Sequence, residues 1–242
     1  MGVIKVAIAD GALTFLWVLC SSCIGVSTYF VATTFGVVNE MGSLFITTLV
    51  VFLMFLVFGF LGDALGGAGF NPTGNAAFYA AGLGDDSLVS AAVRCPAQVA
   101  GAVAGSLAIM ELMPKQYHHM LDGPALKVDV QAGAIAEGVL TFIITFMVFV
   151  IFLRGPKSAL LKNWLLTMVT VPLVVAGSKY TGPSMNPANA FGWAYLSNAH
   201  NTWEHFYVYW VSPFIGAILA AWIFRALFPP PVKQKPRKQK RN

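Results

Sequence analysis

The chain has 242 residues, of which 57% are hydrophobic and only 10% carry a charge. Because soluble domains average roughly 25% charged residues, this composition excludes an ordinary soluble globular protein and indicates an integral membrane protein. Lys and Arg outnumber Asp and Glu by 15 to 10, yet seven of these cations lie within residues 225–242, so the basic excess is a tail and does not indicate a nucleic-acid-binding surface.

Six apolar windows are long enough to cross the roughly 30 Å hydrocarbon core as helices of about 20 residues. The predicted spans are Val6–Ala32, Gly42–Leu61, Leu88–Met113, Gln131–Leu153, Asn163–Ser178 and His205–Phe228. Lys5 before the first window also resembles the start of a signal peptide. Asp10 and the length of the run Ala12–Ala32 favour a retained span.

The cations predict the orientation, because Lys and Arg concentrate on the cytosolic side of spans. With six spans, one face carries Lys5, Arg94, Arg154, Lys157, Lys162 and the basic tail, and the other carries Lys115, Lys127 and Lys179. Both termini are therefore expected in the cytosol.

An internal repeat divides the chain. The segment Ala9–Phe15 in the first span matches Ala136–Phe142 in the fourth, with a carboxylate at the same place. Asn71-Pro72-Thr73 and Asn186-Pro187-Ala188 are 115 residues apart, as are Gly101 and Gly216. Because three spans separate the units, the second half enters the membrane from the opposite face, which predicts an inverted repeat. We expect halves at residues 1–122 and 123–228, followed by a disordered basic cytosolic tail at 229–242.

The two Asn-Pro elements predict short re-entrant half-helices. Proline is favourable in the first turn of a helix, and the residue before it prefers an extended backbone. Helices should therefore begin at Pro72 and Pro187, and irregular backbone at this depth persists only where protein or a water-filled cavity satisfies it. Their N-termini would meet near the midplane, where helix dipoles disfavour cations and the amides of Asn71 and Asn186 donate to a passing water. An isolated Asn-Pro indicates only a turn, whereas the matched pair favours a pore.

The sequence resembles the major intrinsic protein superfamily, the aquaporins, over nearly its whole length. The resemblance is carried by the Asn-Pro elements and by Tyr180–Ala188, Asp10, Glu137 and Tyr209–Ala217. It is most similar to the plant small basic intrinsic proteins, which are short and basic and have an altered first Asn-Pro-Ala. The resemblance implies an all-α membrane protein with an aquaporin-like fold, a homotetramer with one pore per protomer, an endoplasmic reticulum location and no cofactor.

The resemblance also predicts a selectivity filter. In water-specific members an aromatic ring, a His, a loop residue and an Arg after the second Asn-Pro-Ala form this filter, and the matching positions here are Val51, Val174, Pro183 and Asn189. The ring, the imidazole and the cation are missing, so we expect a wider and more apolar constriction. Thr73 in place of Ala is expected to have less effect than Asn189.

Asp10 and Glu137 lie within predicted spans, where burying a carboxylate costs free energy. Such residues are candidates for a functional role. The resemblance implies that they accept hydrogen bonds from the re-entrant loops; a proton relay is the alternative. His118-His119 suggests a metal ligand pair, but the absence of a second ligand cluster favours a solvated loop and no metal site. Cys20 and Cys23 are interpreted as small buried hydrophobes, with a redox pair as the alternative.

In the tail, Lys240 is the third residue from the end and Lys238 the fifth, a pattern that resembles a dilysine retrieval signal that a coat protein reads in the cytosol. The alternative is a segment that binds anionic lipid. The sequence thus predicts a passive channel for water and small uncharged solutes. A poorly conducting scaffold that keeps the fold is the runner-up, and an intramembrane enzyme lacks a paired nucleophile and base.

Overall fold

The computed structural model describes residues 2–83, 87–121 and 123–229. Its long helices are α1 (Val3–Ser21) with α2 (Ile24–Thr34), α3 (Glu40–Ala64), α5 (Leu88–Leu112), α6 (Val130–Phe149) with a π-helical end η2 (Val150–Arg154), α7 (Ala159–Gly177) and α10 (Ser212–Leu227) preceded by α9 (Trp203–Phe206) and η3 (Tyr207–Val211). Short elements are α4 (Pro72–Ala80), η1 (Lys115–Met120) and α8 (Pro187–Leu196). In this part of the chain six helical stretches are long and apolar enough to span a membrane, so the predicted six spans are confirmed.

The second to sixth spans each begin where a side chain caps the free backbone N–H groups of the first turn. The capping residues are Asn39, Ser87, Asp129, Ser158 and Thr202. The fifth span consequently begins at Ala159, four residues before the predicted start, because the side chain of Ser158 accepts the N–H of Leu161.

The first span is not the single helix that the sequence predicts. It extends over Val3–Thr34 but is interrupted between α1 and α2. Ser22 Oγ donates to Val18 O at 2.6 Å, and Cys23 Sγ lies 3.4 Å from Leu19 O. Side chains that bond to the carbonyls of the preceding turn weaken and bend a helix, which explains the break.

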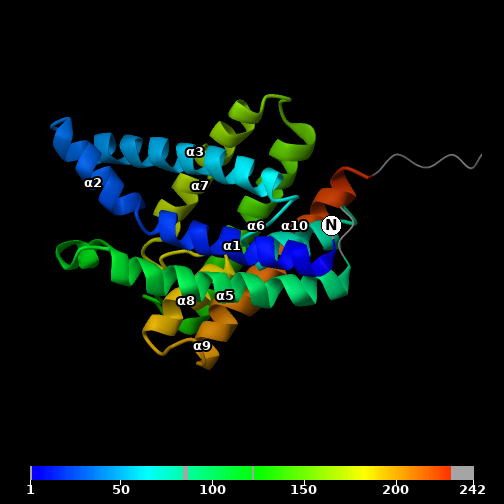
Figure 1. Cartoon of the computed structure of the whole chain (residues 1–242). Helices are drawn as coiled ribbons and strands as arrows, with labels where there is room; N and C mark the ends of the chain where they lie inside the picture. The colour runs from blue at the N-terminus through cyan, green and yellow to red at the C-terminus, as the bar shows by residue number, and fades with distance from the viewer. Residues whose placement is uncertain (1, 84–86, 122, 230–242) are drawn as a thin grey trace, which may run out of the picture.

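The inverted repeat appears as two matched helix pairs. α1 packs along α5 in the first half, and α6 packs along α10 in the second (Figure 1). A Cβ added to Gly101 would meet the backbone oxygen of Gly11, and one added to Gly216 would meet that of Gly138. The paired glycines therefore let helix backbones touch, as small residues do in membranes.

The two halves interlock through their short helices. α4 of the first half packs on α10 of the second, and α8 of the second half packs on α5 of the first. In Figure 1 both described chain ends lie at the right, whereas η1 lies at the left. We call the end that holds residues 113–121, 123–129 and 178–183 the distal end. The boundary between residues 122 and 123 stays a prediction.

The outer surface of the bundle is apolar. Phe45, Leu49, Leu53, Val57 and Phe60 form an exposed stripe along α3, at the three- and four-residue spacing of one helix face. Exposed apolar area of this extent is typical of a surface that faces lipid or another subunit.

Candidate functional site

The two Asn-Pro elements meet inside the bundle. Asn71 Nδ2 donates to Met185 O at 2.9 Å, and Asn186 Nδ2 donates to Phe70 O at 2.9 Å. Each asparagine therefore contacts the residue that precedes the opposite Asn-Pro element. α4 and α8 begin at Pro72 and Pro187, so the N-termini of the two half-helices face one another across this contact.

The asparagines also cap these helices. Asn71 Oδ1 accepts the backbone N–H of Thr73 at 3.0 Å, and Asn186 Oδ1 accepts that of Ala188 at 3.1 Å. An amide NH₂ carries two donors, and the opposite loop uses one of them. Within the described residues, neither asparagine donates a second hydrogen bond from its side chain.

Thr73 takes part in this centre in a way that the sequence did not indicate. Its hydroxyl donates to Asn71 Oδ1 at 2.7 Å and lies 3.4 Å from Met185 O. Alanine, which stands at the matching position Ala188, lacks these contacts. Thr73 thus adds a second restraint on the orientation of the Asn71 amide.

The carboxylates that open each half hold the two re-entrant loops in matching ways. Asp10 Oδ1 accepts the N–H of Gly69 at 2.8 Å, and Glu137 Oε1 accepts the N–H of Ser184 at 2.9 Å. Gly69 and Ser184 are 115 residues apart, the offset of the repeat. Glu137 Oε2 also accepts the N–H of Met185 at 2.9 Å. Both acids are fully buried, so these bonds replace water as their partners.

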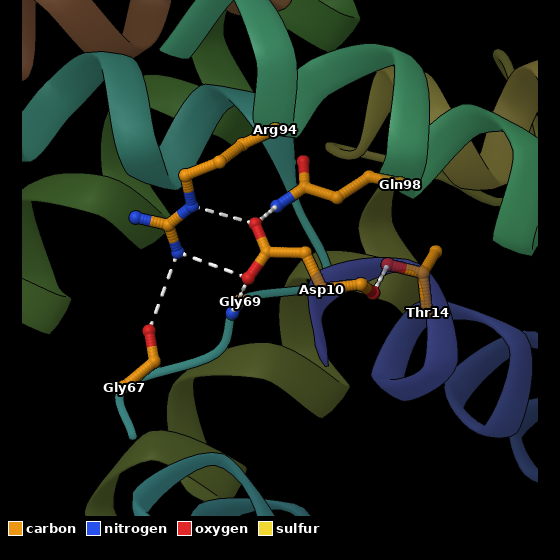
Figure 2. Close-up of polar contacts among 6 residues, drawn as sticks. All are labelled: Asp10, Thr14, Gly67, Gly69, Arg94 and Gln98. Carbon is orange, nitrogen blue, oxygen red and sulfur yellow. Dashed lines mark hydrogen bonds and ion pairs between the residues drawn. The ribbon is translucent and has the colours of Figure 1, made fainter. Parts of the chain in front are cut away.

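Arg94 corrects one sequence-based interpretation. The sequence predicts that Arg94 is one of the cations flanking the spans on the cytosolic face, but its side chain is only 6% exposed and its Nε lies 2.7 Å from Asp10 Oδ2 (Figure 2). Nη2 lies 3.1 Å from Asp10 Oδ1 and 3.3 Å from Gly67 O, and Gln98 Nε2 donates to Asp10 Oδ2 at 2.8 Å. A buried carboxylate requires such compensation, which explains why the cation lies inside.

The repeat relates Arg94 to a residue of the second half. Its partner at an offset of 115 is Tyr209, whose hydroxyl donates to Thr181 O at 2.8 Å. In each half, therefore, one long polar side chain of the last span donates a hydrogen bond to a backbone carbonyl of the re-entrant loop. The first half uses a cation for this contact and the second half a neutral phenol.

The four predicted filter positions lie around one cavity of about 410 Å³ between the helices. Val51 is buried in α3, Val174 lies on α7, and Pro183 and Asn189 flank the second Asn-Pro element. The amide of Asn189 is held by Ser184, because its Nδ2 donates to Ser184 Oγ at 3.2 Å. No arginine is among the described residues that line the cavity.

The sequence missed the aromatic walls of this cavity. Trp17 and Phe55 line it, and the ring of Trp17 stacks on Phe70 with centroids 4.0 Å apart and on Phe55 at 5.9 Å. Val51 brings no ring, but these residues from α1 and α3 do. Hydropathy does not predict that these rings line a cavity, because an aromatic side chain in a span is equally compatible with lipid contact.

A family comparison settles the class of protein that this architecture represents. The profile of the family described as Major intrinsic protein matches residues 2–224. The chain belongs to this family. The resemblance seen in the sequence and the fold that it implied are thereby confirmed.

Relatives cover this intrinsic protein from end to end. It is 58% identical to "Aquaporin SIP1-2" of Zea mays over 97% of each chain, and 52% identical to "Aquaporin SIP1-1" of Arabidopsis thaliana over 99% of each. The solved aquaglyceroporin of Plasmodium falciparum has a TM-score of 0.72 at 17% identity and covers 94% of this chain and 98% of its own. That likeness concerns the fold alone.

His118, Cys20 and Cys23 are not among the described residues that line the cavity. His118 lies in η1 with its Nε2 2.8 Å from Met113 O, and the described residues contain no group of three metal-ligating side chains. Cys20 and Cys23 are free thiols at the break in the first span, where Cys20 is exposed. Lys238 and Lys240 fall outside the residues that the structure describes.

Proposed function

We propose that this passive membrane channel conducts water and other small uncharged solutes across an intracellular membrane. Membership of the major intrinsic protein family makes the chain a channel and not an enzyme. The observation that carries the proposal is the reciprocal contact of Asn71 and Asn186 at the facing N-termini of α4 and α8. A water oxygen there accepts an amide N–H, while the helix dipoles raise the energy of a cation or proton.

The proposed selectivity filter consists of Val51, Val174, Pro183 and Asn189, which line the same cavity. Two valines and a proline contribute no hydrogen-bond donors, and Asn189 contributes no charge. Such a constriction admits neutral solutes larger than water more readily than a filter built from an arginine and an imidazole. Water obtains its hydrogen bonds from Asn71, Asn186 and the loop carbonyls.

We place the protein in the endoplasmic reticulum membrane as a homotetramer with both termini in the cytosol. Six spans bring the two ends to one face, and the cations of the tail favour the cytosolic one. Lys238 and Lys240 would contact a coat protein that returns the channel to the reticulum. Binding of the tail to anionic lipid is the alternative.

Osmotic water flux tests the proposal. Purified protein in liposomes is mixed with a hyperosmotic solution, and stopped-flow light scattering follows the shrinkage. We expect faster shrinkage than in protein-free liposomes, with a weaker temperature dependence, because a pore removes the cost of dissolving water in lipid. A poorly conducting scaffold predicts equal rates. The reciprocal contact of Asn71 and Asn186 supports the channel over this alternative.

A further inference from the structure

The cavity beside the filter contains one unexpected charge. Lys127 lines it at the distal end of the bundle, and it is the only charged side chain among the described residues that do so. Asn189, Pro183 and Val174 line the same cavity, so the ammonium group shares the space through which a solute would reach the filter.

Backbone contacts fix the place of Lys127. Its N–H donates to Tyr180 O at 2.8 Å, and the N–H of Ala125 donates to Thr181 O at 2.9 Å. These two bonds join the loop before α6 to the loop that leads into the second Asn-Pro element. The residue is therefore tied to the element that forms the distal wall of the pore.

The side chain is also held. Lys127 Nζ donates to Ser178 O at 3.1 Å, and Ser178 is the C-cap of α7. The C-terminal end of a helix carries partial negative charge and free carbonyls, which favour a cation there. A carbonyl positions the ammonium without cancelling its charge, and Lys127 forms no ion pair with any carboxylate in the described ranges.

Other charges near the pore do not provide this positive field. Position 189, next to the second Asn-Pro element, is a neutral amide. Arg94 is buried in the first half and paired with Asp10 at 2.7 Å. In the second half the acid Glu137 is paired with backbone N–H groups and Thr181, and with no arginine or lysine of the described chain. Among the described residues that line the cavity, Lys127 therefore carries the one charge that a cation entering it would meet.

We infer that Lys127 is a specificity-determining residue of this pore, whose ammonium group excludes inorganic cations at the distal mouth. The inference rests on the proposed function. A fixed charge at the mouth of a cleft with low-dielectric walls lowers the local concentration of ions of the same sign, whereas a neutral solute is unaffected. Because the side chain is exposed, salt screens this effect over a Debye length of about 8 Å at physiological ionic strength.

The test measures water and K⁺ permeability on the same liposomes, by light scattering and with a K⁺-sensitive dye. Lys127→Gln removes the charge, Lys127→Glu reverses it and Lys127→Arg keeps it. We expect the ratio of K⁺ to water permeability to rise about threefold to tenfold in Lys127→Gln at low salt, and further in Lys127→Glu. Lys127→Arg should match the wild type, and high salt should reduce the differences.

Lys179→Gln is the matched control, because Lys179 is an exposed lysine on the neighbouring loop after α7 and does not line the cavity. It should leave K⁺ permeability unchanged. Normal water flux with unchanged K⁺ flux in both Lys127→Gln and Lys127→Glu would overturn the inference, as would an equal K⁺ leak in Lys179→Gln. The wild type separates the two proposals: if it passes no more water than lipid alone, the proposed function fails before any variant is compared.

Discussion

The buried pair of Arg94 and Asp10 gives the sharpest prediction about stability. Asp10 is fully buried, and two nitrogens of the Arg94 guanidinium lie 2.7 and 3.1 Å from its two oxygens. Arg94→Met keeps most of the apolar length of the side chain but leaves the carboxylate without its cation. Removing one partner of a buried pair costs about 3–5 kcal/mol, and we expect that loss in the free energy of unfolding.

A double-mutant cycle separates the charge from the packing. Asp10→Asn keeps an oxygen that accepts the N–H of Gly69 but strands the guanidinium, so this variant is also destabilised. The double variant Asp10→Asn/Arg94→Met buries no unpaired charge and should recover about 2 kcal/mol relative to the sum of the single losses. Denaturant unfolding in detergent, followed by tryptophan fluorescence, gives the three values. Strictly additive losses would refute the idea that Arg94 compensates Asp10.

Three further changes test other parts of the structure. Asn189→Arg should lower urea and glycerol permeability more than water permeability, because it adds a cation and bulk beside the filter; an equal loss for all solutes would instead indicate a blocked or misfolded pore. Gly101→Ala should reduce the yield of folded protein, since its Cβ would collide with backbone, whereas Gly74→Ala meets no atom within 4 Å and should be tolerated; equal yields would contradict the close packing. Replacing Lys238 and Lys240 with Ser should move a tagged protein out of the reticulum, and an unchanged distribution would exclude the retrieval signal.

The features that the sequence predicted are those with a local physical cause. A span requires a continuous apolar stretch, so hydropathy located all six, and the Pro at the first turn located the starts of α4 and α8. The repeat then added a long-range relation, because an offset of 115 residues with an odd number of spans fixes the inversion. Those observations were sufficient for the fold class.

The missed features depend on packing between distant segments. The sequence places Arg94 among the cations of the cytosolic face, because a sequence window does not show that α5 brings it 2.7 Å from Asp10 of α1. The positions of Trp17 and Lys127 in the cavity wall were not predicted for a similar reason, since their neighbours there lie in other spans and loops. The break at Ser22 and Cys23 was not predicted, because hydropathy does not show which side chains bond to the carbonyls of the preceding turn.

The most direct test of solute passage through this cavity is the water permeability of a variant with the cavity filled. Val51 lines the cavity and is 9% exposed, whereas Val57 on the same helix is 54% exposed and faces outward. Val51→Trp places an indole in the lumen and Val57→Trp places one on the outer face. We expect stopped-flow shrinkage of Val51→Trp liposomes to fall to the protein-free rate while Val57→Trp retains the wild-type rate. Wild-type rates in Val51→Trp, from folded protein, would contradict conduction through this path.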